Sequence, residues 1–207
     1  MRRFALAAVA AVALIAPVLA QAPAQPAPGP NTWTIDTGHS AAGFSVKHLL
    51  VSTVRGTLGP VKGTVEYDGK SLDTLKADIT IDVNFINTGN ESRDKDLKSP
   101  NFFDVAQFPT VTFKSKRSVA DGVGKFKLTG DLTMHGVTKE VTLSVEGPSA
   151  PLKQGPNFRA GASATATINR RDFGLLYSRM VEATPMVSDE VQITLDIEAT
   201  KRAPAGL

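Results

Sequence analysis

The chain of 207 residues contains no cysteine. It therefore forms no disulfide, and a closed structural zinc site would need carboxylates in place of thiolates. The fold must be held together by its apolar core alone. The chain is long enough for this, because a domain of about 150 residues already buries roughly 70% of the surface that its unfolded form exposes.

Long apolar runs are also scarce, and the longest stands at the N-terminus. A positively charged start precedes it, the apolar segment 4–15 is too short to span a bilayer well, and Pro17 breaks it. We interpret residues 1–20 as a signal peptide cleaved near Ala20, which predicts export to the periplasm. No second apolar run is long enough for a transmembrane helix, so we expect no integral membrane segment in the mature chain.

The sequence lacks a strong net charge as well. Removing the signal peptide takes away Arg2 and Arg3 and lowers the formal net charge from +3 to +1. A nearly neutral chain has no overall field to concentrate nucleic acid, so we expect no nucleic-acid partner. The composition divides the rest into an Ala/Pro-rich linker at 21–30, one domain at 31–202 and a short tail at 203–207.

Motifs of nucleophilic and phosphate-binding enzymes are missing too. The chain has no G-x-S-x-G, no free thiol and no Gly-rich phosphate loop that opens a helix. His39 and His48 are separated by an odd number of residues, so on one regular strand they would face opposite ways. We interpret both as hydrogen-bonded polar groups in a mostly apolar setting. The sequence therefore predicts no catalytic residue and no metal ligand, with a His/His/carboxylate site as the alternative.

What the chain does contain is a regular alternation of apolar and polar residues. It runs through the stretches 44–50, 79–85, 126–134, 141–145 and 191–197, with turn signals such as Asp-Gly and His-Gly between them. Such strands bury one face and wet the other, as antiparallel sheets do. We expect an all-β fold, an antiparallel β-barrel of about eight strands, which can be filled by side chains or hold one small ligand.

The segment 88–115 interrupts the alternation. Thr88 and Glu91 have the spacing of a capping box, a charged run follows, and Pro100 should end the helix. Next come four of the ten phenylalanines within twelve residues: Phe102, Phe103, Phe108 and Phe113. We expect a short helix and an aromatic lid across one end of the barrel. The rings either plug that end or form one wall of a pocket for an apolar ligand.

The stretch 158–168 has an unusual apolar face. Its inward positions include Ala160, Ala162, Ala164 and Ala166. Alanine is a poor strand former, and a face built from it leaves volume unfilled. Either a bulky opposite wall packs closely there, or the barrel contains a cavity for an elongated apolar ligand.

The last unusual stretch is 169–177, where three charges, Arg170, Arg171 and Asp172, stand beside Phe173. The cluster is either a solvated turn or a polar clamp for a ligand head group, in which an arginine is oriented by Asp172. The long segment 174–189 that follows is predicted to be a mobile loop near the pocket mouth.

Several short motifs follow one another along residues 33–201. They are DTGHS at 36–40, FSVKH at 44–48, VRG at 54–56, FFDV at 102–105, FP at 108–109, GDLTMHG at 130–136 and RRDFG at 170–174. In this order and spacing they resemble the YceI family of exported, lipocalin-like, polyisoprenoid-binding proteins. The resemblance covers essentially the whole predicted domain.

The resemblance implies a barrel with a helical lid that holds a long isoprenoid chain, such as that of a polyprenyl quinone, for storage or transport. No other cofactor is implied. On this basis we expect a set of pocket residues: Phe44, Val46, Phe85, Phe102, Phe103, Phe113 and Phe173, with His48 and Arg170 as polar contacts. Two other classes stay open, a stress-related periplasmic protein with a packed barrel and a His/metal-dependent enzyme for a hydrophobic substrate. A homodimer is also possible.

Overall fold

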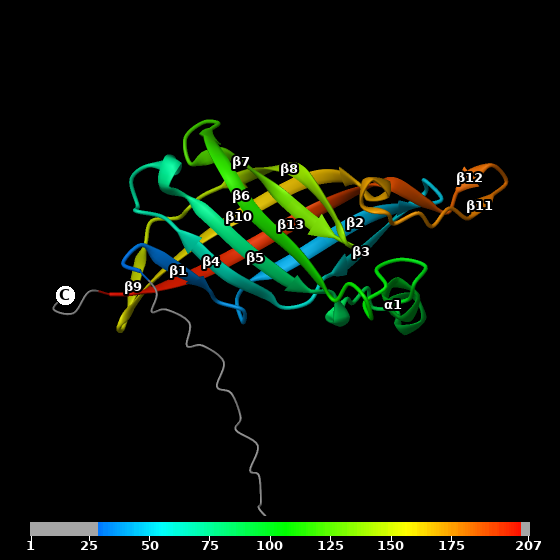
Figure 1. Ribbon diagram of the computed structural model, residues 1–207, viewed down its shortest axis with the longest axis horizontal. Coiled ribbons are helices and arrows are strands. Elements are labelled where there is room, and N and C mark those ends of the chain that lie inside the picture. Colours follow the sequence, from blue (N-terminus) through cyan, green and yellow to red (C-terminus); the bar gives the residue numbers. More distant parts are fainter. Residues whose placement is uncertain (1–28, 204–207) are drawn as a thin grey trace, which may run out of the picture.

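The alternating stretches form the long antiparallel strands of a closed barrel in the computed structural model, which describes residues 29–203 (Figure 1). The predicted signal peptide, most of the predicted linker and the last residues of the tail lie outside the described residues. Six walls are continuous strands: β5 (Lys76–Asp82), β6 (Thr110–Ala120), β7 (Lys125–Met134), β8 (Val137–Glu146), β10 (Asn157–Asn169) and β13 (Val187–Arg202).

Two further walls each consist of two strands in line. β1 (Thr32–Ile35) and β2 (Ala41–His48) both pair with β13, while β4 (Val61–Glu66) pairs with β1 and β3 (Ser52–Thr57) with β2. The pairing of β10 with β13 closes the ring of eight walls. This confirms the predicted antiparallel barrel of about eight strands.

Smaller elements decorate the two ends of the barrel. β9 (Leu152–Gln154) extends the edge of β10, and β11 (Met180–Val181) and β12 (Thr184–Pro185) form a separate hairpin. Short 3-10 turns occupy Leu72–Thr74, Val83–Phe85 and Arg170–Phe173. Figure 1 shows β9 at one end and the β11–β12 hairpin at the other. None of the helices in the described part of the chain has the length and apolar character that crossing a membrane requires.

The inward positions of the strands supply the core, as the alternation predicts. On β5, for example, Ala77, Ile79 and Ile81 are buried. The prediction is wrong at the end of this stretch, where the chain leaves the sheet in a 3-10 turn and Phe85 is 62% exposed. Leu50 is likewise exposed, because it belongs to the turn after β2 and has a positive φ of 60°.

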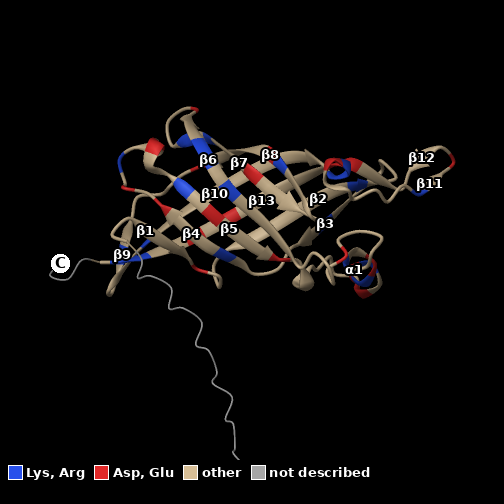
Figure 2. Cartoon of the chain, in the orientation of Figure 1, with Lys and Arg blue, Asp and Glu red and all other residues tan. Residues whose placement is uncertain are grey.

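Charged residues of both signs are interspersed along the strands (Figure 2), and the side chains of the ion pairs among them are exposed. Lys116 Nζ is 2.5 Å from Asp131 Oδ1, and Lys125 Nζ is 2.6 Å from Glu146 Oε1. Exposed pairs of this kind contribute little to stability, because water and salt screen them. They identify the outward face of the sheet rather than hold it together.

The helix α1 (Glu91–Lys98) lies outside the barrel, and none of its side chains is buried (Figure 1). It ends at Ser99, before Pro100, as predicted. The predicted capping box is wrong, because the N-cap is Asn90, whose Oδ1 accepts from Arg93 N at 3.0 Å. The Thr88 hydroxyl instead donates to Asp94 Oδ1 at 2.6 Å, which ties the preceding turn to the helix.

The aromatic lid follows α1 and is densely packed. Phe102 stacks on Tyr177 with ring centroids 4.6 Å apart, and Phe108 meets His135 edge-on at the same separation. Because Tyr177 belongs to the segment 174–189, this segment lies at the lid end, where part of it forms the β11–β12 hairpin.

Candidate ligand-binding cavity

An apolar cavity of about 310 Å³ lies inside the barrel at the end opposite α1. It is lined by the first residues of β5 and β7 and the last residues of β8, whereas α1 follows the other end of β5. Bulky apolar walls come from several strands: Phe126, Leu128, Leu143, Val145, Leu195 and Ile197. The volume falls within the range of roughly 300–1,000 Å³ that small-molecule sites occupy.

Alanines create this space. Ala160, Ala162 and Ala164 of β10 line the cavity, and Ala199, which faces Ala160 across the β10–β13 pairing, lines it too. Side chains this short leave unfilled the volume that larger residues would occupy. Of the two alternatives for the alanine face, the structure therefore has the cavity. Ala166, the fourth alanine, packs against the core beyond it.

One wall of the cavity is a loop instead of a strand. β8 pairs with β10 only at Ser163–Thr165, and β9 pairs with it only at Asn157–Arg159. Between them the segment 147–151 lies against β10, where Ser149 N donates to Gly161 O at 2.8 Å and Gly161 N donates to Ser149 Oγ at 3.0 Å. Pro148 and Pro151 of this segment face the cavity.

The residues predicted to contact the ligand do not line this cavity. Phe102, Phe103 and Phe173 belong to the packed lid end, Phe44, Val46 and His48 lie on β2, and Phe113 is buried in the core. Phe85 is exposed beside α1. The structure thus brings most of these residues to the other half of the barrel, and their contact with a ligand stays a prediction.

Arg170 is buried, and each of its three guanidinium nitrogens donates to an acceptor of the protein. Its Nε donates to Ser188 O at 3.0 Å, its Nη1 donates to Leu175 O, and its Nη2 donates to Asp189 Oδ1 at 2.7 Å. Burial lowers the pKa of the guanidinium from its usual value, and Asp189 partly offsets this. The carboxylate that orients Arg170 is therefore Asp189 and not the predicted Asp172. Through Ser188 and Asp189, Arg170 joins the end of β10 to the start of β13.

Sequence reasoning missed Trp33, which lines the cavity and is 6% exposed. Its Nε1 is buried and has no hydrogen-bond acceptor among residues 29–203. Lys201 Nζ lies 4.7 Å from the centre of the Trp33 ring. The sequence did contain a signal for the neighbouring strand. The alternation at 191–197, continued along the chain with the same period of two, places Ala199 and Lys201 on the inward face.

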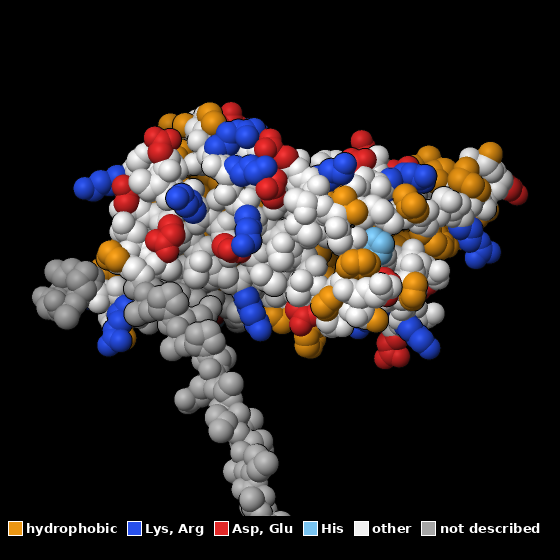
Figure 3. Space-filling model, viewed as in Figure 1, with side chains coloured by type: hydrophobic (Ala, Val, Ile, Leu, Met, Phe, Trp, Pro, Cys, Tyr) orange, Lys and Arg blue, Asp and Glu red, His pale blue; other side chains and the backbone are white. Residues whose placement is uncertain are grey.

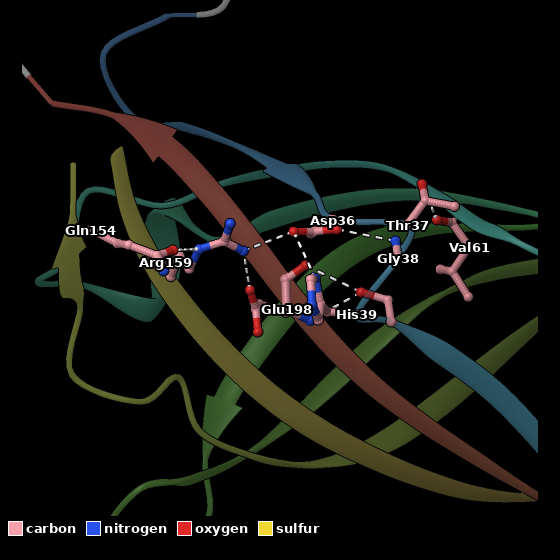
Figure 4. Close-up of polar contacts among 9 residues, drawn as sticks. Asp36, Thr37, Gly38, His39, Val61, Gln154, Arg159 and Glu198 are labelled. Atoms are coloured by element: carbon pink, nitrogen blue, oxygen red, sulfur yellow. Dashed lines mark hydrogen bonds and ion pairs between the residues drawn. The ribbon is translucent and has the colours of Figure 1, made fainter. Parts of the chain in front are cut away.

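A polar cluster stands on the outer face near the cavity end (Figure 4). Arg159 Nη1 donates to Asp36 Oδ2 at 2.8 Å and also to a carboxylate oxygen of Glu198. His39 Nδ1 is 3.1 Å from Asp36 Oδ2. The hydrogen bond from Arg159, followed by that from His39, lowers the pKa of Asp36 to about 2. The cluster joins the break between β1 and β2 to β10 and β13.

The same cluster is the nearest approach to a metal site among the described residues. One ligand atom each from Asp36, His39 and Glu198 lie within 4.8 Å of one another. Arg159 already donates to both carboxylates, so a cation would have to displace its guanidinium. The His39 side chain is 64% exposed, which contradicts the predicted apolar setting.

Comparison with known proteins identifies the family. The YceI-like domain family matches residues 33–199, which is nearly the whole barrel. The chain belongs to the YceI-like family. A UPF0312 protein of Staphylococcus aureus is 40% identical over 154 residues, covering 73% of this chain and 86% of that protein.

Solved structures agree with this assignment. The YceI protein of Campylobacter jejuni is 29% identical with a TM-score of 0.65, covering 76% of this chain and 90% of that one. A polyisoprenoid-binding domain from Saccharophagus degradans has a TM-score of 0.59 at 19% identity, covering 83% and 98% of the two chains. The second likeness, at so low an identity, supports the fold alone.

The DTGHS motif at 36–40 lies in the break between β1 and β2 and connects this break to the neighbouring strands. Ser40 Oγ donates to Glu198 O at 3.2 Å and accepts from Glu198 N at 3.0 Å, while Thr37 Oγ1 donates to Val61 O at 3.0 Å. These contacts replace the ladder hydrogen bonds that the break between β1 and β2 removes. The motif therefore keeps the two strands in line.

Proposed function

We propose that this chain is an exported periplasmic protein that binds an isoprenoid lipid in the barrel cavity, for storage or transport. The observation that carries the proposal is the apolar cavity beside Ala160, Ala162 and Ala164. The signal peptide predicted at 1–20 supports export. The solved structure from Saccharophagus degradans, with which this chain shares its fold, is named as a polyisoprenoid-binding domain, and we carry this class of ligand over to the chain as part of the proposal.

The physical basis of binding is burial of apolar surface. Each Å² of apolar surface removed from water contributes about 25 cal/mol, from which the cost of ordering the flexible chain is subtracted. A cavity of about 310 Å³ is at the small end of the usual range. A long isoprenoid would therefore place only its first units there and extend the rest outside, or the barrel would have to open further.

The family and the lining favour a binding protein over an enzyme. Apart from main-chain groups, the lining consists almost entirely of apolar side chains, with no histidine, aspartate or glutamate among the described residues. General acid–base chemistry needs a titratable group within hydrogen-bonding reach of the reacting atom. Among the described lining residues only the phenol of Tyr67 belongs to the usual groups, whereas an apolar chain fits the rest of the cavity.

The test is mass spectrometry of lipid extracted from the mature protein after purification from the periplasm without detergent. We expect a stoichiometric polyprenyl lipid with the natural chain. Ala164→Phe, which fills the cavity, should remove the lipid, and Ala166→Phe on the same face but outside the cavity should keep it.

Two outcomes would contradict the proposal. One is a natural chain that carries no lipid and binds no isoprenoid quinone on titration, which favours a stress-related periplasmic protein that binds no lipid. The other is a folded Ala164→Phe variant that retains as much lipid as the natural chain, because the ligand would then lie elsewhere.

A further inference from the structure

We propose that the segment 147–151, which we call the strap, is a movable wall that swings away from β10 and admits the lipid into the cavity sideways, between β8 and β10. This inference rests on the proposed function and adds to it the route by which a ligand enters. It starts from the place along β10 where the wall of the cavity is a loop instead of a strand.

The strap closes a weakly paired edge of β10. Along its other edge, β10 pairs with β13 over all thirteen of its residues. Along the edge that the strap closes, β10 pairs with β8 at Ser163–Thr165 and with β9 at Asn157–Arg159, and the strap lies beside the gap between these two pairings. Opening this edge locally therefore costs less than opening the edge with β13.

Few contacts hold the strap against β10. Ser149 N donates to Gly161 O at 2.8 Å, and Ser149 Oγ accepts from Gly161 N at 3.0 Å. Pro148 and Pro151 have no N–H to donate. Residues 148–151 are all exposed. Few buried contacts and solvent-exposed hydrogen bonds are typical of segments that open without global unfolding.

The strap separates the cavity from solvent by a single layer of residues. Residues 148–151 line the cavity from inside, and an open groove lies on the outer surface beside them. Ser149, Gly161 and Ala162 border both the cavity and this groove. Outward displacement of the strap would join the two spaces, which enlarges a cavity that is small for a long isoprenoid.

Both ends of the strap are attached, so it can move while the barrel stays folded. At one end Gly147 N donates to Gly124 O at 2.8 Å, next to the start of β7. At the other end the strap continues into β9, which pairs with β10 at the same end of the barrel (Figure 1). Gly147 has a φ of 127°, a conformation that favours glycine, and it supplies a flexible hinge.

The experiment measures how fast a farnesyl-substituted benzoquinone quenches the fluorescence of Trp33, the single tryptophan, which lines the cavity. Stopped-flow mixing gives the association rate, and displacement by excess unlabelled protein gives the dissociation rate. The natural mature chain is compared with variants that loosen or lock the strap.

Ser149→Ala loosens the strap, because it removes the acceptor of Gly161 N. We expect the association and dissociation rates each to rise about threefold to tenfold. The equilibrium dissociation constant should stay within about twofold, because a gate changes both rates alike. Ser144→Ala is the control. Ser144 is exposed on β8 and lies outside the cavity lining, so its variant should leave both rates unchanged.

The locked form carries Ser149→Cys and Gly161→Cys. Backbones joined in this way lie about 5 Å apart, which a disulfide can span. A side chain at Gly161 would meet Ile197 O as its nearest neighbour at 3.3 Å, a contact that a small shift relieves. The natural chain has no cysteine, so this disulfide is unambiguous.

We expect the oxidised form to bind the quinone at least about tenfold more slowly than its reduced form, because the strap can no longer open. The control is Lys127→Cys with Ser144→Cys, which face each other across β7 and β8. Its oxidation joins two strands that stay paired throughout and should change the rate by less than about twofold.

The proposal is overturned if the oxidised strap binds as fast as the reduced strap, because the ligand would then enter through the end of the barrel. It is also overturned if Ser149→Ala raises the dissociation rate alone, which would make the strap a static contact. Either result leaves the proposed binding in the cavity intact. If the quinone does not quench Trp33 in the natural chain, the proposed function fails, and the entry route fails with it.

Discussion

The two ends of the barrel differ in how they are filled. At the lid end, aromatic rings stack on one another, Phe173 is only 2% exposed, and the buried Arg170 donates to three acceptors of the protein. At the other end, alanines of β10 leave a cavity of about 310 Å³, and the buried Trp33 nitrogen has no acceptor among the described residues.

This difference separates stability from binding. Large rings that interdigitate at close to crystal density stabilise a fold but leave no room for a ligand. Small side chains give up packing energy and leave space. In this family member the phenylalanine-rich segment 102–113 closes one end of the barrel, whereas the alanines of β10 leave space inside the other end.

Exposed apolar side chains also gather at the lid end, over the β11–β12 hairpin (Figure 3). Leu176 is 58% and Met180 55% exposed. They lie outside the closed end, so they are separated from the cavity by the packed lid. Val123, in the turn before β7, and Leu152 of β9 are exposed near the cavity end as well, so apolar surface is present at both ends of the barrel.

The largest effect is expected from Phe173→Ala, which should lower the free energy of unfolding by about 3–5 kcal/mol. The matched variant at the cavity end is Phe126→Ala, where the ring is 4% exposed but borders the cavity. We expect it to cost at least about 1 kcal/mol less, because one face of the ring already lacks packing partners. Denaturant titration measures both, and equal losses would contradict the contrast between the ends.

Arg170→Met should lower the free energy of unfolding by about 2–4 kcal/mol, because the carbonyls of Leu175 and Ser188 lose a buried donor. Arg171→Met is the control, since its neighbouring side chain is 45% exposed. It should change stability by less than about 0.5 kcal/mol. A destabilisation of the same size in both variants would show that Arg170 is not the specific anchor.

Adding volume should distinguish the cavity from the packed core. Ala42 is 1% exposed and lies outside the cavity lining, so Ala42→Phe should cost about 1–3 kcal/mol through overpacking. Ala164→Phe should cost less than about 1 kcal/mol, because the ring enters existing space. Thermal unfolding of the lipid-free variants tests this, and a larger loss in Ala164→Phe would mean that the space is not available.

The smallest effect concerns pH. Asp36 has a pKa lowered from 3.8 to about 2 by Arg159 and His39. Its stabilising contribution is thus fully present above about pH 4. It is lost as the pH falls from about 4 towards 2, where protonation removes the ion pair with Arg159.

The measurement is the melting temperature between pH 5 and pH 2 for the natural chain and Asp36→Asn. The natural chain should lose more stability than the variant over this window, since asparagine has no charge to lose. Parallel curves would show that this cluster does not contribute through its ionisation.

The barrel could be predicted because strand alternation is a local property that the fold preserves on every wall. The face formed by Ala160, Ala162 and Ala164 indicated either a cavity or close packing against a bulky opposite wall, and only the arrangement of the facing strands decides between these two. Which end held the cavity could not be predicted, since the sequence does not say whether Phe102 and Phe173 pack on each other or on a ligand. The helix cap was mispredicted for a similar reason. Asn90 and Thr88 both have side chains that can cap a helix, and the conformation of the turn determines which of them does.

Lys201 and Trp33 show a second limit. They are far apart in sequence, and the antiparallel pairing of β1 with β13 brings them together. Neither residue belongs to a motif, so the spacing of motifs gave no signal for them.

The most direct test of the cavity uses Trp33 as the probe, because it is the single tryptophan and borders the space. A farnesyl-substituted benzoquinone should quench its fluorescence saturably in the natural chain and in Phe103→Leu at the lid end, but not in folded Ala164→Phe. Saturable quenching that persists in Ala164→Phe and is lost in Phe103→Leu would contradict the account, because the ligand would then occupy the lid end.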